Sequence, residues 1–251
     1  MTRYDTIGRT YASTRRPDPR IARQIAAALG AATRIVNVGA GTGSYEPAGR
    51  VAAACDPSAT MLRQRPAGAA PSVLASAEAL PFADGAFDAA LATLTVHHWD
   101  DRAAGLRELR RVAPRQVVLF FEPSWTSTIW MLAEYFPEID QLPTERVAPG
   151  LDFLAAHLDV ERVEVVMVPA DCEDGFGGCY WNRPEGYLDP AVQQGMSSLA
   201  QLDPEILRRG TEKLRHDLES GAWDERHGAL REMREIDLGY RLLVARNQHL
   251  S

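Results

Sequence analysis

Short runs of apolar residues recur along the first half of the chain, separated by turn-forming and charged segments. They are continuous rather than alternating, which is typical of parallel strands that are covered on both faces. We therefore predict five buried strands in a parallel sheet. The runs are RIVNV (34–38), VAAAC (51–55), SVLAS (72–76), FDAALATL (87–94) and QVVLFF (116–121).

Two helices are predicted beside these strands. In residues 18–29 an apolar residue recurs at every fourth position, and Asp18 followed by Pro19 suits a helix cap and first turn. Residues 100–113 carry one apolar face among charged residues. Strands that alternate with helices are typical of a doubly wound α/β sheet, so we predict a Rossmann-like fold.

The second half of the chain has a different pattern. Residues 161–170 and 237–246 predict two further strands, which brings the mostly parallel sheet to seven. The segment between them is rich in aromatic and charged residues, and Asp203-Pro204 suits a helix start within it. We expect an N-terminal helical lid, a Rossmann-like core, a helical insertion before the last strand and a terminal strand, at residues 1–30, 31–170, 171–236 and 237–251.

Composition limits the cellular location and the kinds of binding partner that we expect. The formal net charge of −7 does not favour a nucleic-acid-binding surface. The N-terminus has no apolar stretch of signal-peptide length, and the longest apolar run, VVLFF, is far too short to span a bilayer. The three cysteines match neither a disulfide framework nor a common zinc pattern. We expect a cytoplasmic protein with no nucleic-acid, membrane or metal partner.

The run RIVNV leads directly into three glycines, Gly39, Gly41 and Gly43. Glycines at a strand-to-helix turn let a ligand touch the main chain, and ligands of open α/β sheets lie beyond the carboxyl ends of strands. Asp56, at the end of the next run, is placed to accept hydrogen bonds from both hydroxyls of a ribose. The pattern predicts a nucleotide-like ligand. The alternatives are a tight turn without a ligand and an Asp56 that caps a turn before Pro57.

Ser44 helps to distinguish a dinucleotide site from a site for another nucleotide-like ligand. A dinucleotide site usually has a third glycine at the last place of GxGxxG, where a pyrophosphate meets the start of a helix. Ser44 occupies that place here, which argues against a dinucleotide.

Five motifs follow one another in the first half of the chain: VNVGAGTG, ACDPSATML, SAEALPFADGAFDAAL, HHW and LRELRRVAP. In order and spacing they resemble the motifs of class I S-adenosylmethionine-dependent methyltransferases, in the methyltransferase-type-11 or UbiE-like branch. The resemblance covers about residues 34–122 and implies S-adenosylmethionine as the cofactor.

The resemblance also implies a role for each matching residue. Gly39, Ala40 and Gly41 would lie against the methionine part of the cofactor, Asp56 would hold the ribose hydroxyls, and Thr93 would lie near the sulfonium. The adenine would be bordered by Pro57, Ser58, Met61, Ser76 and Ala77, with Glu78 supporting the loop. The N-terminal segment would close over the site through Tyr4, Tyr11 and Arg16, although both tyrosines could instead simply pack.

Two residues depart from the family pattern. The family usually has an acidic residue at the position of Asn37, where it helps to hold the ammonium of the cofactor, and an Asp is common at the position of Ser76. The uncharged Asn37 is expected to weaken cofactor binding, whereas the hydroxyl of Ser76 can still accept from the adenine amino group. Neither departure is expected to change the fold.

His97 and His98 are the candidate catalytic bases. They follow the fourth apolar run, and imidazole titrates near neutral pH. We prefer His97, because neighbours in sequence rarely both face one pocket. The alternative is a structural role, such as stacking on Trp99, since a base is needed only when the acceptor must lose a proton.

The acceptor site is expected in the insertion, where residues 174–188 concentrate aromatic side chains. These either line an apolar pocket or form the core of a cap, and we favour the core. Our leading interpretation is a methyltransferase that acts on O, N or C of a small molecule. An NAD(P)-dependent oxidoreductase and a non-catalytic cofactor-binding paralogue remain alternatives.

Overall fold

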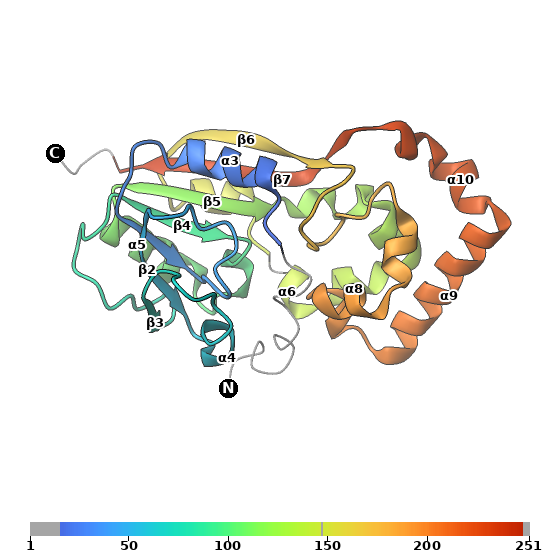
Figure 1. Ribbon diagram of the computed structural model, residues 1–251, viewed down its shortest axis with the longest axis horizontal. Coiled ribbons are helices and arrows are strands. Elements are labelled where there is room, and N and C mark those ends of the chain that lie inside the picture. The colour runs from blue at the N-terminus through green and yellow to red at the C-terminus, as the bar shows by residue number, and fades with distance from the viewer. Residues whose placement is uncertain (1–15, 147, 248–251) are drawn as a thin grey trace.

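The computed structural model describes residues 16–146 and 148–247 (Figure 1). Tyr4 and Tyr11, which we expected at the mouth of the site, lie outside these ranges. Within the described residues, seven strands form one sheet in the order β3-β2-β1-β4-β5-β7-β6, which confirms the predicted doubly wound fold. The strands are β1 (Ile35–Val38), β2 (Val51–Asp56), β3 (Ser72–Leu74), β4 (Ala89–Thr93), β5 (Arg115–Phe121), β6 (Val160–Pro169) and β7 (Glu235–Arg246).

The sheet is parallel except at one strand. β3, β2, β1, β4 and β5 pair in parallel, whereas β7 lies between β5 and β6 and is antiparallel to both. β6 therefore pairs with β7 alone and forms one edge of the sheet.

Helices cover both faces of the sheet, which explains the continuous apolar runs. Neighbouring residues of a strand point to opposite faces. Ile35 packs in the same core layer as α3 (Pro19–Ala28), whereas Val36 packs in the layer that contains α5 (Arg102–Val112). Both residues are fully buried, so each face needs an apolar side chain.

Two helical segments extend beyond the ends of the strands, and together we name them the cap: residues 122–146, after β5, and residues 171–234, after β6. Figure 1 shows α8, α9 and α10 of the second segment standing beyond the sheet. The first segment and the link to β6 contain η3 (Pro123–Thr128), η4 (Met131–Tyr135), η5 (Pro137–Gln141), α6 (Pro143–Arg146) and α7 (Leu151–Ala155). The second contains η6 (Pro184–Leu188), α8 (Pro190–Gly195), η7 (Leu199–Gln201), α9 (Pro204–Ser220), α10 (Ala222–His227) and η8 (Gly228–Glu232).

The two segments of the cap pack tightly on each other. A Cβ atom on Gly210 of α9 would come within 2.4 Å of both Phe136 Cε1 and the Tyr135 carbonyl oxygen. The ring of Trp130 meets that of Trp223 edge to face at a centroid distance of 5.3 Å. We therefore treat residues 122–146 and the insertion as one packed unit. Across the described part of the chain, no helix combines the length and apolarity needed to cross a bilayer.

Candidate functional site

The carboxyl end of β1 leads into a loop of residues 39–45 that we name the glycine loop. Its backbone has positive φ angles at Gly39 (68°), Gly41 (52°), Gly43 (94°) and Tyr45 (62°). Glycine adopts such angles readily, whereas a residue with a side chain does so at a cost. The loop turns sharply at the centre of the sheet, where β1 lies between β2 and β4.

The three glycines are needed for different reasons. A Cβ on Gly39 would lie 2.0 Å from Thr95 Oγ1, so this glycine makes room for a neighbouring side chain. A Cβ on Gly43 would crowd Arg65 Nη1 at 3.1 Å. A Cβ on Gly41 would meet only the end of the Met61 side chain, at 3.2 Å, and Gly41 and Met61 both line a cavity. Among the three, Gly41 has the clearest relation to a ligand.

Asp56 joins the glycine loop to the end of β2. Its Oδ2 accepts a hydrogen bond from the backbone N–H of Gly41 (2.8 Å), and its Oδ1 accepts one from that of Ser58 (2.8 Å). Ser58 in turn caps the short helix α4 (Ala59–Leu62) by accepting from the N–H of Met61. Asp56 is 8% exposed and lines the same cavity as Gly41. It therefore has the capping role that we had considered and also faces the candidate ligand site.

This smaller cavity encloses about 550 Å³, counting its opening. Its wall comes from the stretch between Asn37 and Tyr45, from Asp56 and Met61, and from Thr93–Thr95 with His98. The structure thus brings together these residues predicted for the cofactor: Gly39, Ala40, Gly41, Asp56, Met61 and Thr93.

Other residues predicted for the cofactor lie outside this wall. Pro57 and Ser76 are exposed, and Ala77 is buried. Glu78 Oε1 accepts from the backbone N–H of Asp101 at 3.2 Å, so it ties the loop after β3 to the start of α5. Arg16 is exposed at the start of the described chain. Their predicted contacts with adenine and with the cofactor carboxylate stay predictions.

A buried ion pair lies close to the glycine loop. The sequence pattern did not predict it. Arg65 donates from Nη1 and Nη2 to the two carboxylate oxygens of Glu46, at 2.9 and 2.8 Å, and these side chains are 5% and 11% exposed. Glu46 Oε1 also accepts from Asn37 Nδ2 at 2.9 Å. The amide of Asn37 is therefore oriented by a carboxylate whose charge is already balanced.

Two buried oxygens at the cavity lack a hydrogen-bond partner among the described residues. They are Asn37 Oδ1 and Thr93 Oγ1. Both residues line the smaller cavity, and Asn37 is 1% exposed. Because an unsatisfied buried polar atom costs about 1–3 kcal/mol, such atoms fit a cavity that is built to receive a polar ligand.

His97 and His98 lie in the single turn η2 (Val96–His98), just beyond β4. Their ring centroids are 3.7 Å apart. Arg102 Nη2 donates to the backbone oxygen of His97, which fixes this turn against α5. Both histidines line a second, larger cavity, and His98 lines the smaller one as well. Because both histidines face the larger cavity, this criterion does not favour His97. Of the two, His98 also lines the smaller cavity.

The larger cavity encloses about 970 Å³, counting its mouth, and lies between the sheet and the cap. Its wall combines residues 94–98 and 119–121 of the sheet side with Ile129, Met131 and residues 176–178 and 196–198 of the cap. Most of these side chains are apolar, which is typical of small-molecule sites.

The aromatic residues of the insertion divide between two roles. Trp181 and Tyr187 are 1% and 0% exposed, and they pack in the core of the cap, as we favoured. The Tyr180 ring lies close against Gly186, where a Cβ would come within 2.4 Å of it. Phe176 lines the larger cavity and is also 5% exposed. The wall of the larger cavity also includes Met131, Leu132 and Ile139, which lie in helices after β5 that we did not predict.

The Cys55 and Cys172 thiols are buried. Burial raises the pKa of the Cys55 and Cys172 thiols to about 12, so both stay protonated near neutral pH. Within residues 16–146 and 148–247, no group of three His, Cys, Asp or Glu side chains could hold a metal ion.

Comparison with known proteins relates the chain to methyltransferases. The family model described as "Methyltransferase domain" matches residues 36–121, which contain the glycine loop, Asp56 and both histidines. The demethylmenaquinone methyltransferase of Corynebacterium kroppenstedtii is 37% identical over 83 residues, 32% of this chain and 36% of that protein. A crystal structure of an Anabaena variabilis protein, described as a methyltransferase assigned to an antibiotic biosynthesis pathway, has a TM-score of 0.85 and 29% identity, over 93% of this chain and 99% of that one. Residues 36–121 therefore form a methyltransferase domain, and the chain as a whole is similar to methyltransferases.

Other relatives match a shorter stretch of this chain or share fewer identical residues with it. The uncharacterized protein YafE of Escherichia coli K12 is 53% identical over 36 residues. The chain spans 17% of the length of that protein and 36% of the demethylmenaquinone methyltransferase. A Bacillus halodurans protein described as a methyltransferase shares the fold, with a TM-score of 0.53 and 15% identity over 90% of this chain and 97% of that one.

Proposed function

We propose that this protein transfers the methyl group of S-adenosylmethionine, held in the smaller cavity, to an O, N or C atom of a small molecule held in the larger cavity. One observation carries the proposal. Leu94, Thr95 and His98 line both cavities, so a donor and an acceptor would meet just beyond β4. Placing the two reactants against each other is the main task of the protein in such a transfer.

The residues of the smaller cavity fit this cofactor. Asn37 Oδ1 is a buried oxygen in need of a donor, which the ammonium of the cofactor can supply. Asp56 is a carboxylate that can accept from ribose hydroxyls, and Gly41 leaves the main chain open to a ligand. When bound, S-adenosylmethionine supplies a methyl group on a positively charged sulfur.

His98 is our candidate for the base. It borders both cavities, so its imidazole lies where an acceptor hydroxyl or amine would lose its proton. His97 borders the larger cavity and would contact the acceptor alone. In this proposal the apolar wall of the larger cavity binds the body of the acceptor and excludes water from the transfer.

Calorimetric titration tests the cofactor assignment. We expect S-adenosylmethionine and S-adenosylhomocysteine to bind and NAD to give no heat. Incubation with S-adenosylmethionine carrying a radioactive methyl group, with a panel of small hydroxyl and amine compounds, then tests turnover. Absence of binding by both sulfur compounds would contradict the proposal. Binding without transfer to any acceptor would favour a non-catalytic protein.

The Asp56→Ala variant tests the ribose contact. Loss of a hydrogen bond to a charged group should weaken binding of S-adenosylhomocysteine by about 1–3 kcal/mol. Asp88→Ala is a matched control, because Asp88 also accepts from two backbone N–H groups, those of Thr33 and Arg34, but lies outside the cavity wall. Equal affinity in the two variants would show that Asp56 does not contact the cofactor.

A further inference from the structure

Tyr45 ends the glycine loop in a backbone conformation that tyrosine rarely adopts. Its φ angle is 62°, and its side chain is 3% exposed in the core layer that also contains α3. Tyr45 also lines the smaller cavity. A left-handed backbone at a bulky residue is costly and persists where the surroundings hold it in place.

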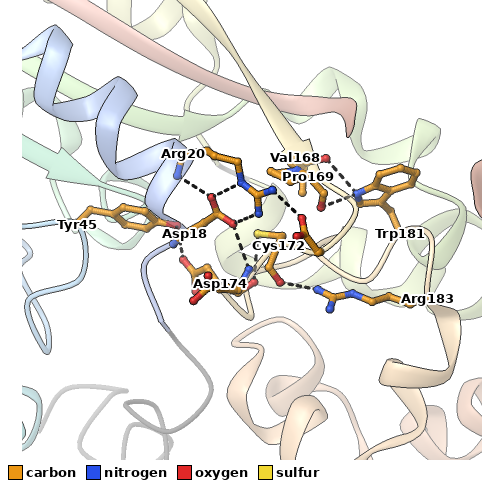
Figure 2. A network of polar contacts seen from close by, with 11 residues as sticks. Asp18, Arg20, Tyr45, Val168, Pro169, Cys172, Asp174, Trp181 and Arg183 are labelled. Carbon is orange, nitrogen blue, oxygen red and sulfur yellow. Dashed lines mark hydrogen bonds and ion pairs between the residues drawn. The ribbon is translucent and has the colours of Figure 1, made fainter. Parts of the chain in front are cut away.

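The hydroxyl of Tyr45 forms hydrogen bonds that help to hold this backbone conformation. The same bonds join three segments of the chain. It donates to Asp174 Oδ2 at 2.8 Å, and it lies 3.4 Å from the backbone nitrogen of Asp18, from which it can accept. Figure 2 shows the ring reaching from the glycine loop toward both residues. Asp174, which is 1% exposed, belongs to the cap, and Asp18 immediately precedes α3.

Residues 171–174, at the start of the second cap segment, are also held by contacts with Asp18, Arg20 and Arg183. Asp18 Oδ2 accepts from the backbone N–H of Glu173 at 3.2 Å, and Arg20 bridges Asp18 to Asp171. Arg183 Nη2 donates to the backbone oxygen of Cys172 (Figure 2). Residues 171–174 are therefore held as one unit, and this unit meets the glycine loop through Tyr45.

Asp174 is two residues from the wall of the larger cavity. Phe176, Gly177 and Gly178 all line that cavity. Tyr240 holds this wall in place, since its hydroxyl donates to the Gly177 oxygen and its ring packs on Phe176 at a centroid distance of 4.6 Å. A short physical path thus leads from the smaller cavity, through the Tyr45–Asp174 bond, to one side of the larger cavity.

We propose that Tyr45 is a positioning residue that couples occupancy of the smaller cavity to the placement of residues 174–178. The inference rests on the proposed function, because it takes the smaller cavity as the cofactor site and the larger one as the acceptor site. A cofactor that orders the glycine loop orders, through Tyr45, the wall that meets the acceptor. Coupling between two sites is reciprocal, so each ligand then favours binding of the other.

Hydrogen exchange measured by mass spectrometry tests the coupling without a known acceptor. S-adenosylhomocysteine is added to the wild-type protein, and amide exchange is followed in peptides covering residues 39–46 and 172–181. We expect slower exchange in both regions. In Tyr45→Phe, exchange in residues 39–46 should still slow, whereas the response of residues 172–181 should be lost. The variant should bind S-adenosylhomocysteine about three- to tenfold more weakly, as for one lost hydrogen bond.

Two further variants exclude a merely structural effect. Tyr180→Phe removes a hydroxyl from the same segment, whereas the Tyr45 hydroxyl bonds to Asp174 and Asp18, so the response should persist. Asp174→Asn keeps an oxygen that accepts from Tyr45, so the response should again persist. An Asp174→Asn protein that behaves like Tyr45→Phe would overturn the proposal.

The wild-type protein separates this inference from the proposed function. If S-adenosylhomocysteine binds and slows exchange in residues 39–46 but not in 172–181, the coupling is wrong and the cofactor site stands. If the compound neither binds nor alters exchange anywhere, the proposed function itself fails. Equal slowing of residues 172–181 in Tyr45→Phe and the wild type would also contradict the coupling.

Discussion

Arg65 donates to both carboxylate oxygens of Glu46 close to Gly43, and Glu46 in turn orients the amide of Asn37. The family pattern has an acidic residue where this chain has Asn37. Here the carboxylate lies nine residues further along the chain, is neutralised by Arg65, and leaves Asn37 Oδ1 as the polar atom at the cavity. The cofactor ammonium would then meet a neutral oxygen rather than a charge.

Removing Arg65 should strongly destabilise the protein. Arg65→Ala leaves Glu46 buried and unpaired, and breaking a buried ion pair costs about 3–5 kcal/mol. Urea unfolding measures this loss. Arg208→Ala is the control, since Arg208 pairs with Glu205 and Glu212 on an exposed helix face, where the cost should be below about 1 kcal/mol. A similar loss of stability in both variants would show that the buried pair has no special importance.

Gly39→Ala should cost more than its backbone angle alone explains. Gly39 and Gly49 have nearly the same φ, 68° and 70°, but a Cβ on Gly39 overlaps Thr95 whereas one on Gly49 meets open space. Gly49→Ala should cost about 1 kcal/mol or somewhat more, the penalty of a left-handed alanine. Gly39→Ala adds the overlap, so its urea midpoint should be clearly lower. Equal midpoints would mean that Thr95 moves aside freely.

Replacing the two histidines should have unequal effects on turnover. Because His98 borders both cavities, His98→Ala should lower kcat by about 10²–10⁴-fold for an acceptor that loses a proton. His97→Ala should mainly raise the KM for the acceptor. The measurement is initial-rate kinetics with an acceptor found by the radiolabel screen, together with calorimetry to verify that cofactor binding is retained. A larger fall in kcat for His97→Ala would restore our first choice of base.

Asp18 should contribute to stability in a defined pH window. Burial opposes ionisation, but hydrogen bonds from Arg20 and from the Glu173 N–H outweigh it and lower the pKa of Asp18 to about 2. A lowered pKa in the folded state stabilises the protein above the unfolded pKa near 4, and this contribution is lost as the pH falls from about 4 to 2. Asp18→Asn should therefore be less stable at pH 7, and its stability should fall less than that of the wild type over that window.

The sheet could be predicted because its physical cause is local. The central strands β1, β4 and β5 are buried on both faces, so continuous apolar runs such as residues 116–121 mark these strands directly. The glycine loop, Asp56 and His98 could be singled out because they follow such runs, and Thr93 because the family motifs place it at the end of one; residues of all four lie in the wall of the smaller cavity.

The remaining site residues depend on contacts that sequence spacing does not reveal. Glu46 and Arg65 are 19 positions apart, and neither motif nor periodicity links them. The helices after β5 are short and interrupted by Pro137, Pro143 and Pro149, so no helical period could develop. Aromatic residues have the same pattern whether they line a cavity or fill a core, which is why Phe176 and Trp181 could not be told apart.

The position of β7 has a consequence for synthesis on the ribosome. β6 pairs with β7 alone, and the whole second segment of the cap is translated between these two strands. Until residues 235–246 have left the exit tunnel, β6 therefore has no partner strand and β5 is an unpaired edge of the sheet. The sheet closes by inserting a late strand between two earlier ones, a long-range step that should make folding slow and dependent on protection of that edge by chaperones.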